Sequence, residues 1–525
     1  MDDDESWRSL LTETLQDGGF HADAVATTEE ALEHIQSSLY HVLVLDLRMQ
    51  EGSDREQGME LLRGLVLADF DASVRIIMLT AYASKENTHE AFRQYRISDF
   101  LEKQEYDDAA FLRQMEKVFT DELRINLDLE IHWKQVSGPE QLVVNLEIDG
   151  QRVKRDSPLQ TLAAAELDDL LCRLFHDARS LLVRPLGEGM SGCSVLWVKP
   201  FYDDGAGGAR VVKFGDFRLI DAEYRNYHEY VEKFIGEGRS TAVPPDGLRR
   251  TARLGGIIYS LLGGAVEQTE SFGSFYANAD IEQIKRVLDG LFFETCKGWY
   301  SNPGAQRLLN LTEEYKRELN FTTEGLTRAL SEGLKSVQGK QKLRFGSLLA
   351  ERTFTNPLLA MTGFNFEEST YVCTTHGDLN ENNILVDESS HTWLIDFDST
   401  GRGHILRDVA ELDSVLRFRL LGPEEATLEE RLKMEESLCR PRRFRDIEQL
   451  EATFSTDNPA VAKTFAATLH LRTIARRLVL QSDEINEYYV ALFYYAVNAI
   501  RFYSLSTVQR LHALLSASLI VDLLE

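Results

Sequence analysis

A carboxylate, a carboxamide and a second carboxylate follow one another in the second half of the chain at a spacing that suits phosphoryl transfer. The run HGDLNENN at 376–383 holds Asp378 and, five residues later, Asn383, and Asp396 comes directly after an apolar, β-prone run. In ATP-dependent transfer one such group accepts the proton of the attacking hydroxyl, and two others hold magnesium on the triphosphate. Tripeptides of this kind also arise by chance, but the full pattern rarely does. We therefore expect a kinase-type site.

The other half of such a site is expected upstream, where glycines, a lysine and a glutamate follow in order. Gly187, Gly189 and Gly192 lie between two apolar runs, and glycine lets backbone amides approach phosphate oxygens closely. Lys213 lies in a predicted strand, from which its ammonium could reach the α- and β-phosphates, and the helical stretch that follows carries Glu223 as an ion-pair partner. Each feature alone also fits a hairpin turn, a surface lysine or a solvated glutamate. Their order favours a nucleotide site.

Residues from about 180 to 525 resemble the aminoglycoside phosphotransferase and choline kinase branch of the protein-kinase-like fold. The resemblance implies an α+β domain with an N-lobe at 181–265 and a mostly helical C-lobe at 266–525, and ATP and Mg²⁺ as cofactors. This part is also similar to the ternary complex associated domains of bacterial conflict systems. By this resemblance Asp378 would be the catalytic base, and Asn383 and Asp396 would be the metal ligands. Lys213 would bind phosphate with Glu223 orienting it, and Gly187, Gly189 and Gly192 would form the lid over the phosphates. His376 would be a packing residue of the catalytic loop, and Gly263 and Gly264 would form the hinge.

The N-terminal part has three apolar runs that each end in a polar group able to handle a phosphoryl group. The first ends at Asp46, the second at Thr80 and the third at Lys103, with amphipathic stretches between them. Alternating strands and helices at this spacing predict a parallel, doubly wound sheet with its site at the carboxyl ends of the strands. Asp46 would accept a phosphoryl group as nucleophile, and Thr80 and Lys103 would stabilise the transferred oxygens. Asp2 and Asp3 would bind magnesium.

The segment 1–120 resembles a response-regulator receiver domain, which implies a flavodoxin-like fold, a histidine kinase or another phosphodonor as partner, and Phe100 at the aromatic switch position. Receivers have an apolar strand before the acid pair, whereas this sequence has the acids directly after Met1. We expect either a true start upstream or an impaired receiver, with a gap in the middle of the sheet. The loop at 50–57 is also longer than usual, and Gln104 stands where a proline commonly follows the lysine, so a cis bond is not expected. A simpler interpretation of Asp46 is that it caps a turn at the end of its strand.

Residues 121–180, between the two regions, are predicted to form a connector. Within 124–153 apolar residues alternate as in two strands, and 156–180 has the spacing of a helix with one apolar face. The segments 461–480 and 487–524 are predicted to form long helices of the C-lobe.

The composition is that of a soluble globular protein, with 43% apolar and 27% charged residues. A net charge of −28 argues against a nucleic-acid partner because phosphate repels such a surface, although the arginine-rich stretch 440–445 is a local exception. The longest apolar stretches are too short to cross a bilayer, and nothing resembles a secretion signal. The five cysteines lack metal-type or disulfide-type spacing, which predicts free thiols in a reducing cytoplasm.

These features predict a cytoplasmic, ATP-dependent phosphotransferase that is regulated by an N-terminal receiver domain. It would transfer the γ-phosphoryl group to a hydroxyl of a small molecule or a protein, with no nucleic-acid or membrane partner. The alternative is a catalytically silent, nucleotide-binding scaffold in a bacterial signalling or defence complex. The presence of Lys213, Asp378, Asn383 and Asp396 together favours catalysis.

Overall fold

The chain divides into two compact units, each made of two segments. Met1–Ala222 and Val243–Ser260 form the first unit, and Glu223–Ala242 and Leu261–Glu525 form the second. The chain first passes from one to the other within α8 (Phe217–Asn226). The structure, a computed structural model, describes residues 1–46, 61–62, 64, 74–80, 97–187, 192–234, 241–261, 269–301, 303–321, 340–345, 349, 352–480 and 482–524.

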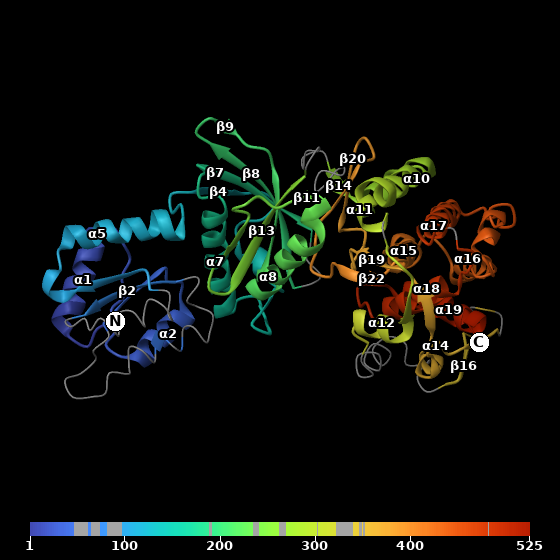
Figure 1. The fold of residues 1–525 in the computed structure, drawn as a ribbon, viewed down its shortest axis with the longest axis horizontal. Helices are drawn as coiled ribbons and strands as arrows, with labels where there is room; N and C mark the ends of the chain where they lie inside the picture. The colour runs from blue at the N-terminus through green and yellow to red at the C-terminus, as the bar shows by residue number, and fades with distance from the viewer. Residues whose placement is uncertain are drawn as a thin grey trace. The chain divides into compact units, whose positions relative to one another are not determined.

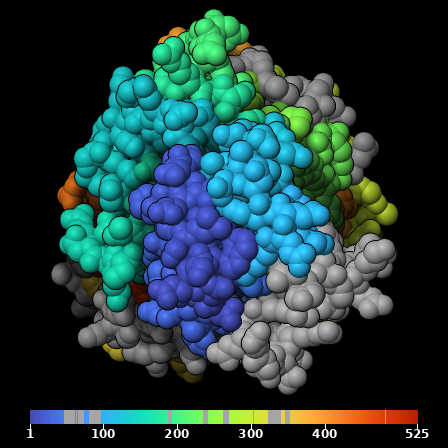
Figure 2. Space-filling model, turned by 90° about the vertical axis from the view of Figure 1, so that its left-hand side faces the viewer, coloured from blue at the N-terminus to red at the C-terminus, as the bar shows by residue number. Residues whose placement is uncertain are grey.

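A three-stranded parallel sheet with helices forms the N-terminal part of the first unit (Figure 1). Among the described residues, its strands follow the order β1 (Val42–Leu45), β2 (Arg75–Thr80) and β3 (Asp99–Glu102). The helices with complete bounds are α1 (Glu5–Asp17), α2 (Thr28–Ser37) and α5 (Asp108–Lys117). Figure 2 shows the dark blue N-terminal residues beside the lighter blue residues that carry α5.

Alternate residues of β2 are buried against different helices. Ile76 and Met78 belong to a cluster with apolar residues of α2, whereas Ile77 and Leu79 belong to a second cluster with residues of α1 and α5. Successive side chains of a strand point to opposite faces of a sheet, so helices cover both faces. This confirms the predicted parallel, doubly wound sheet. Thr27 caps α2 and forms a capping box with the helix.

The first two residues of the chain are bonded to backbone on two sides. The Met1 amino group donates to the carbonyl of Val44 at 2.7 Å, and the amide of Asp46 donates to the carbonyl of Met1 at 3.0 Å. On the other side the amide of Asp2 donates to the carbonyl of Val25 at 3.2 Å. A cavity of about 460 Å³ opens here, lined by Met1, Asp2 and Val25 and by residues of α1, α2 and β1. The predicted gap in the middle of the sheet stays a prediction.

A second sheet, largely antiparallel, forms the rest of the first unit, with α7 (Pro158–Leu174) packed on it (Figure 1). Strands β13, β10, β8, β7 and β4 follow one another in this sheet; among these five, β7 and β4 pair in parallel and the other neighbours are antiparallel. The strands span β4 (Glu130–Trp133), β7 (Ser180–Gly187), β8 (Ser194–Tyr202), β9 (Gly205–Ala206), β10 (Arg210–Asp216), β12 (Leu248–Arg250) and β13 (Leu254–Leu261).

One strand predicted in the connector is wrong. The apolar residues Leu142, Val144 and Leu146 alternate as in a strand, but Glu140–Val143 form the short helix α6. Pro139, whose φ is −66°, precedes this helix in the helical region, where proline is favoured at a helix start. Two short strands, β5 (Glu147–Ile148) and β6 (Gln151–Arg152), pair after the helix instead. The other predicted strand and the helix of the connector are confirmed as β4 and α7.

The pKa of Asp168 on α7 gives this part of the chain a pH-dependent stability. Burial, and then the charge of Glu140, raise the pKa of Asp168 from 3.8 to about 6. The folded chain therefore binds this proton more tightly than the unfolded chain, and stability is lost as the pH rises from about 4 to about 6. We predict that Asp168→Asn stabilises the protein by about 1–3 kcal/mol at pH 7.5 and has little effect at pH 4. Urea unfolding of both proteins at the two pH values measures this, and an equal difference at both would contradict it.

The second unit combines small sheets with many helices. β20 pairs with β14 and β21, and the remaining strands form the pairs β15–β18, β16–β17 and β19–β22. The strands span β14 (Thr269–Ser271), β15 (Arg307–Asn310), β16 (Lys342–Arg344), β17 (Thr353–Thr355), β18 (Glu367–Thr370), β19 (Val372–Thr375), β20 (Ile384–Asp387), β21 (Thr392–Leu394) and β22 (Gly401–His404). The helices span α9 (Phe272–Asn278), α10 (Ile281–Gly290), α11 (Lys297–Tyr300), α12 (Leu311–Glu318), α14 (Pro357–Ala360), α15 (Arg407–Ser414), α16 (Leu428–Leu438), α17 (Pro459–Leu478), α18 (Asn486–Ile500) and α19 (Thr507–Leu524).

Buried ion pairs connect the C-terminal helices. Asp413 of α15 accepts from Arg417 at 2.5 Å and from Arg472 of α17 at 2.9 Å, and Arg417 also donates to Glu435 of α16. All four side chains are almost completely buried. Because an unpaired buried charge is costly, these pairs fix how the three helices pack.

Helix α19 is long and apolar enough to cross a membrane, judged by length and composition in the described part of the chain. However, 61% of the residues in its apolar window are buried inside the protein. A helix in the core of a protein has the same property, so this helix gives only weak evidence for a membrane span. The predicted helix at 461–480 is confirmed as α17, and the one at 487–524 is divided into α18 and α19.

Candidate functional site

The loop between β19 and β20 brings the carboxylate of Asp378 and the amide of Asn383 together. The Nδ2 group of Asn383 donates to the backbone carbonyl of Asp378 at 2.8 Å and to its Oδ2 atom at 3.0 Å. With its nitrogen bonded to Asp378, the amide keeps its Oδ1 atom as a possible metal ligand. The structure therefore joins two of the three groups that the sequence singles out for this site, and the third, Asp396, comes after β21.

Asp396 comes two residues after the end of β21, and the residue between them is bonded to the same loop. The amide of Ile395 donates to the carbonyl of Asn383 at 3.1 Å, so the strand end and the loop are adjacent. Asp396 has a φ of +72°, in the left-handed region that a residue with a side chain rarely adopts. Such strain is kept where the surroundings impose it, and it is concentrated at functional sites.

Glu223 accepts a hydrogen bond from the backbone next to Asp396. Its Oε1 atom accepts from the amide of Phe397 at 3.1 Å, and the side chain is fully buried. Glu223 therefore holds the segment that carries the predicted metal ligand. Lys213, its partner in the sequence analysis, is buried in β10 of the first unit, between β8 and β13. The ion pair of Lys213 with Glu223 stays a prediction.

Asp408 at the start of α15 supports the loop before Asp378. Its carboxylate accepts from the amides of His376 at 2.7 Å and Gly377 at 2.9 Å, and from the hydroxyl of Tyr300 at 2.5 Å. Sequence reasoning assigned no role to Asp408. The signal that could have found it is an aspartate in the first turn of a helix shortly after the predicted metal ligand.

His376 and Gly377 shape the loop from within. His376 is fully buried, and its Nε2 atom lies 3.1 Å from the carbonyl of Ile395, which agrees with the packing role expected for it. Gly377 has a φ of +84°, and a Cβ atom there would lie 2.2 Å from the carbonyl oxygen of Ser399. Only glycine fits this position without displacing the backbone.

Two further acids, Glu381 and Glu411, lie close to Asp378 in the described structure. The amide of Leu379 donates to Glu411 at 2.9 Å, and burial, followed by the charge of Asp378, raises the pKa of Glu411. Glu381 pairs with Arg419 at 2.8 Å, and burial raises its pKa although Arg419 lowers it. Burial is the main cause of both shifts and the charge of Asp378 adds to them, so both acids lie within electrostatic reach of Asp378.

The predicted glycine loop is described only at its two ends. Gly187 ends β7, and Gly192 has a φ of +79° that favours glycine. Gly189 and the predicted hinge at 263–264 lie outside the described residues.

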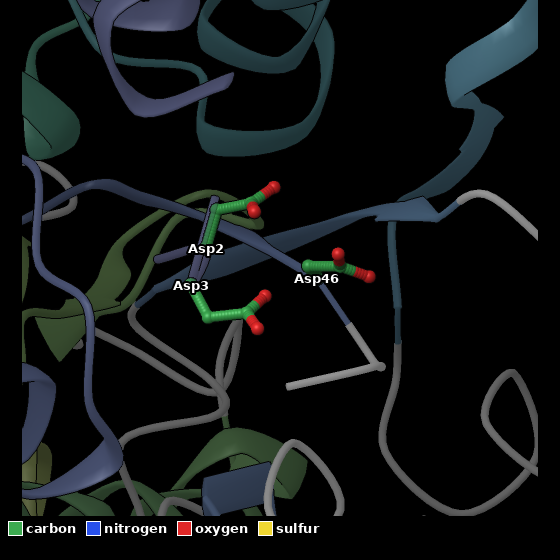
Figure 3. A group of neighbouring side chains, drawn as sticks. All are labelled: Asp2, Asp3 and Asp46. Atoms are coloured by element: carbon green, nitrogen blue, oxygen red, sulfur yellow. The ribbon is translucent and has the colours of Figure 1, made fainter. Parts of the chain in front are cut away.

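The carboxylates of Asp2, Asp3 and Asp46 gather at the end of β1 (Figure 3). Each offers an oxygen that lies within 4.8 Å of the others, and oxygen atoms from carboxylates are the ligands that Mg²⁺ prefers. Lys103, after β3, bonds to Asp2 at 2.6 Å and to Asp46 at 2.7 Å. Four of the five predicted receiver residues are thus together. The fifth, Thr80, ends β2, and its side chain lies outside the description.

The Lys103 ammonium lies between two of the carboxylates of this cluster. Burial lowers the pKa of Lys103, but the hydrogen bonds that its ammonium donates to Asp2 and Asp46 outweigh this and raise the pKa, so Lys103 stays charged. Burial also raises the pKa of Asp2, against the opposite effect of Lys103. The three carboxylates gather here beside the Lys103 ammonium and the guanidinium of Arg8, which donates to the carbonyls of Asp2 and Asp3, and a divalent cation would add the charge and the coordination that carboxylate oxygens favour. The cluster therefore fits a magnesium ion.

Two family models match the chain. The model described as ternary complex associated domain 9 matches residues 178–342 and 342–501, and the model described as response regulator receiver domain matches residues 1–115. No curated protein matches.

Several solved structures are similar to parts of the chain. A sensor protein from Polaromonas sp. JS666 is 26% identical over 22% of this chain and 89% of that chain, with a TM-score of 0.20. The aminoglycoside phosphotransferase APH(3'')-Id from Streptomyces rimosus is 14% identical over 54% of this chain and 90% of that chain, with a TM-score of 0.25. The choline kinase LicA from Streptococcus pneumoniae is 15% identical over 60% of this chain and 92% of that chain, also with a TM-score of 0.25.

Proposed function

The chain belongs to the family described as ternary complex associated domain 9 and has a receiver domain before it, and we propose that it is an ATP-dependent phosphotransferase controlled by that receiver. Its acceptor would be a hydroxyl group of a small molecule or a protein. The observation that carries this proposal is the bonding of Asn383 to the carboxylate of Asp378, beside the strained strand end at Asp396. In this proposal Asp378 would be the base, and Asn383 and Asp396 would supply two oxygen ligands for a cation.

The residues of this loop divide the work of the transfer. Asp378 accepts the proton of the acceptor hydroxyl, and the acceptor oxygen forms a bond to the γ-phosphorus while the bond to the β-phosphate oxygen breaks, so ADP leaves. Asn383 and Asp396 would hold Mg²⁺, which offsets the charge of the phosphates when it is bound. Asp408 keeps the loop in place through the amides of His376 and Gly377.

The proposal is tested by incubating the purified chain with labelled ATP, Mg²⁺ and fractionated pools of metabolites and proteins. We expect label to move from ATP to one acceptor class and ADP to accumulate. If ATP binds but neither ADP nor a labelled acceptor forms in any pool, the chain is a nucleotide-binding scaffold instead.

The receiver would take a phosphoryl group on Asp46, where Lys103 and a cation would balance the added charge. An Asp46 oxygen forms the new bond to phosphorus while the bond between phosphorus and the leaving group of the donor breaks. We predict that acetyl phosphate with Mg²⁺ labels the wild-type chain and that Asp46→Ala removes the label. Asp23→Ala, at an exposed aspartate of the same domain, serves as the control and should be labelled normally. Equal labelling of the Asp46 variant would contradict the assignment.

A further inference from the structure

Helix α7 contacts the receiver and the strand that carries Lys213 with two different sets of side chains. Its leucines lie in one core cluster with Val212 and Phe214, the neighbours of Lys213 on β10. The fit is close, because a Cβ atom on Gly256 of the adjacent strand β13 would lie 2.9 Å from Leu174 of α7. Any shift of α7 would therefore be felt by β10, since close-packed interiors transmit displacement.

The acids of α7 bind the receiver segment 36–41. Asp169 accepts from His41 at 2.6 Å through one oxygen and from Arg173 at 2.7 Å through the other. Arg253 donates to Glu166 of α7 at 2.6 Å and to the carbonyl of Gln36 at 2.6 Å. We call these two contacts, His41 with Asp169 and Gln36 with Glu166 through Arg253, the α7 clamp.

The α7 clamp lies at the opposite end of β1 from the receiver site. His41 directly precedes β1, and Asp46 directly follows it. The carbonyl of His41 also accepts from Arg75 at the start of β2 at 2.8 Å. One four-residue strand therefore connects the clamp with the carboxylate that Lys103 holds.

We propose that the α7 clamp carries the state of the receiver to the strand of Lys213, and that it favours the arrangement in which Lys103 bonds to Asp2 and Asp46. The clamp and these ion pairs are present together in the structure. A phosphoryl group on Asp46 moves negative charge from the carboxylate to the phosphoryl oxygens, so Lys103 must follow it. If the clamp stabilises the arrangement in which Lys103 bonds to Asp2 and Asp46, it must by linkage oppose the arrangement in which Lys103 binds a phosphoryl group on Asp46. The part of this inference that concerns Lys213 rests on the proposed function.

The test uses the full chain and beryllofluoride with Mg²⁺ as a phosphoryl mimic. His41→Ala combined with Arg253→Lys removes both receiver contacts but leaves a cation beside Glu166. We expect this double variant to bind beryllofluoride at least about fivefold more tightly than wild type, a typical size for coupling between sites. Tryptophan fluorescence reports the binding as a change in signal, since the Lys103 ammonium lies 5.1 Å from the ring of Trp7, one of the five tryptophans of the chain. His34→Ala is the control, because His34 is an exposed receiver histidine that contacts Tyr40.

The second measurement is the affinity for ATP with and without beryllofluoride. In wild type we expect beryllofluoride to change the ATP affinity, and in the double variant we expect that change to disappear. An unchanged beryllofluoride affinity in the double variant and in His41→Ala alone would overturn the clamp. A wild-type change in ATP affinity that persists in the double variant would overturn α7 as the route. If no form binds ATP, the proposed function fails, while the beryllofluoride comparison still decides whether the clamp restrains the receiver.

Discussion

Asp378→Asn is expected to lower ATP turnover by roughly 10²- to 10⁴-fold, the usual contribution of a general base. The amide has nearly the size of the carboxylate, and its oxygen can still accept the bond from Asn383. However, it cannot take a proton from the acceptor hydroxyl at neutral pH. We therefore expect ATP affinity to stay within about threefold of wild type while the turnover rate falls, which is the pattern for an interaction made in the transition state.

The measurement is single-turnover ADP formation together with calorimetric ATP binding. Asp457→Asn is the matched control, because Asp457 is an exposed aspartate in the loop before α17. It should leave both quantities unchanged. Wild-type turnover in the Asp378 variant would remove Asp378 as the base, and a loss of ATP binding would show that the carboxylate acts in nucleotide binding instead.

The sequence predicts local parts of the site well, because their geometry depends on short spacing. Asp378 and Asn383 are five residues apart and meet within one loop. The ends of β1 and β3 place Asp46 and Lys103 together, as a parallel sheet requires. In both cases a strand end fixes a polar side chain, and the strand itself is recognised from its apolar run.

What the sequence misses depends on contacts between distant segments. Asp408 bonds to amides about thirty residues earlier, and no periodic pattern marks an acceptor for backbone groups. Glu223 contacts the amide of Phe397 across an even longer stretch of chain. The helix α6 was mistaken for a strand because four residues are too few to distinguish the two periods.

Asp408→Asn is expected to destabilise the second unit by about 2–4 kcal/mol, since each buried donor left without a partner costs about 1–3 kcal/mol. Asp408 is completely buried and uses its carboxylate for the amides of His376 and Gly377 and the hydroxyl of Tyr300. The asparagine side chain has only one acceptor oxygen, and its NH₂ group would face one of these three donors. Urea unfolding measures the loss, and ATP turnover should fall by about 10²-fold, because a displaced loop misplaces Asp378.

Two further variants separate a role in positioning from a role in stability alone. Asp387→Asn is the control, because Asp387 also accepts two backbone amides, from Ser389 and His391, but is a partly exposed residue at the end of β20. We expect it to cost less than about 1.5 kcal/mol and to leave turnover intact. Tyr300→Phe removes only the hydroxyl that bonds to Asp408, so stability should fall by about 1 kcal/mol while the loop amides remain held. If the loss of turnover in the three variants follows their loss of stability, Asp408 has a structural role alone. If only Asp408→Asn loses turnover, the bonds of Asp408 to the loop amides position the base Asp378.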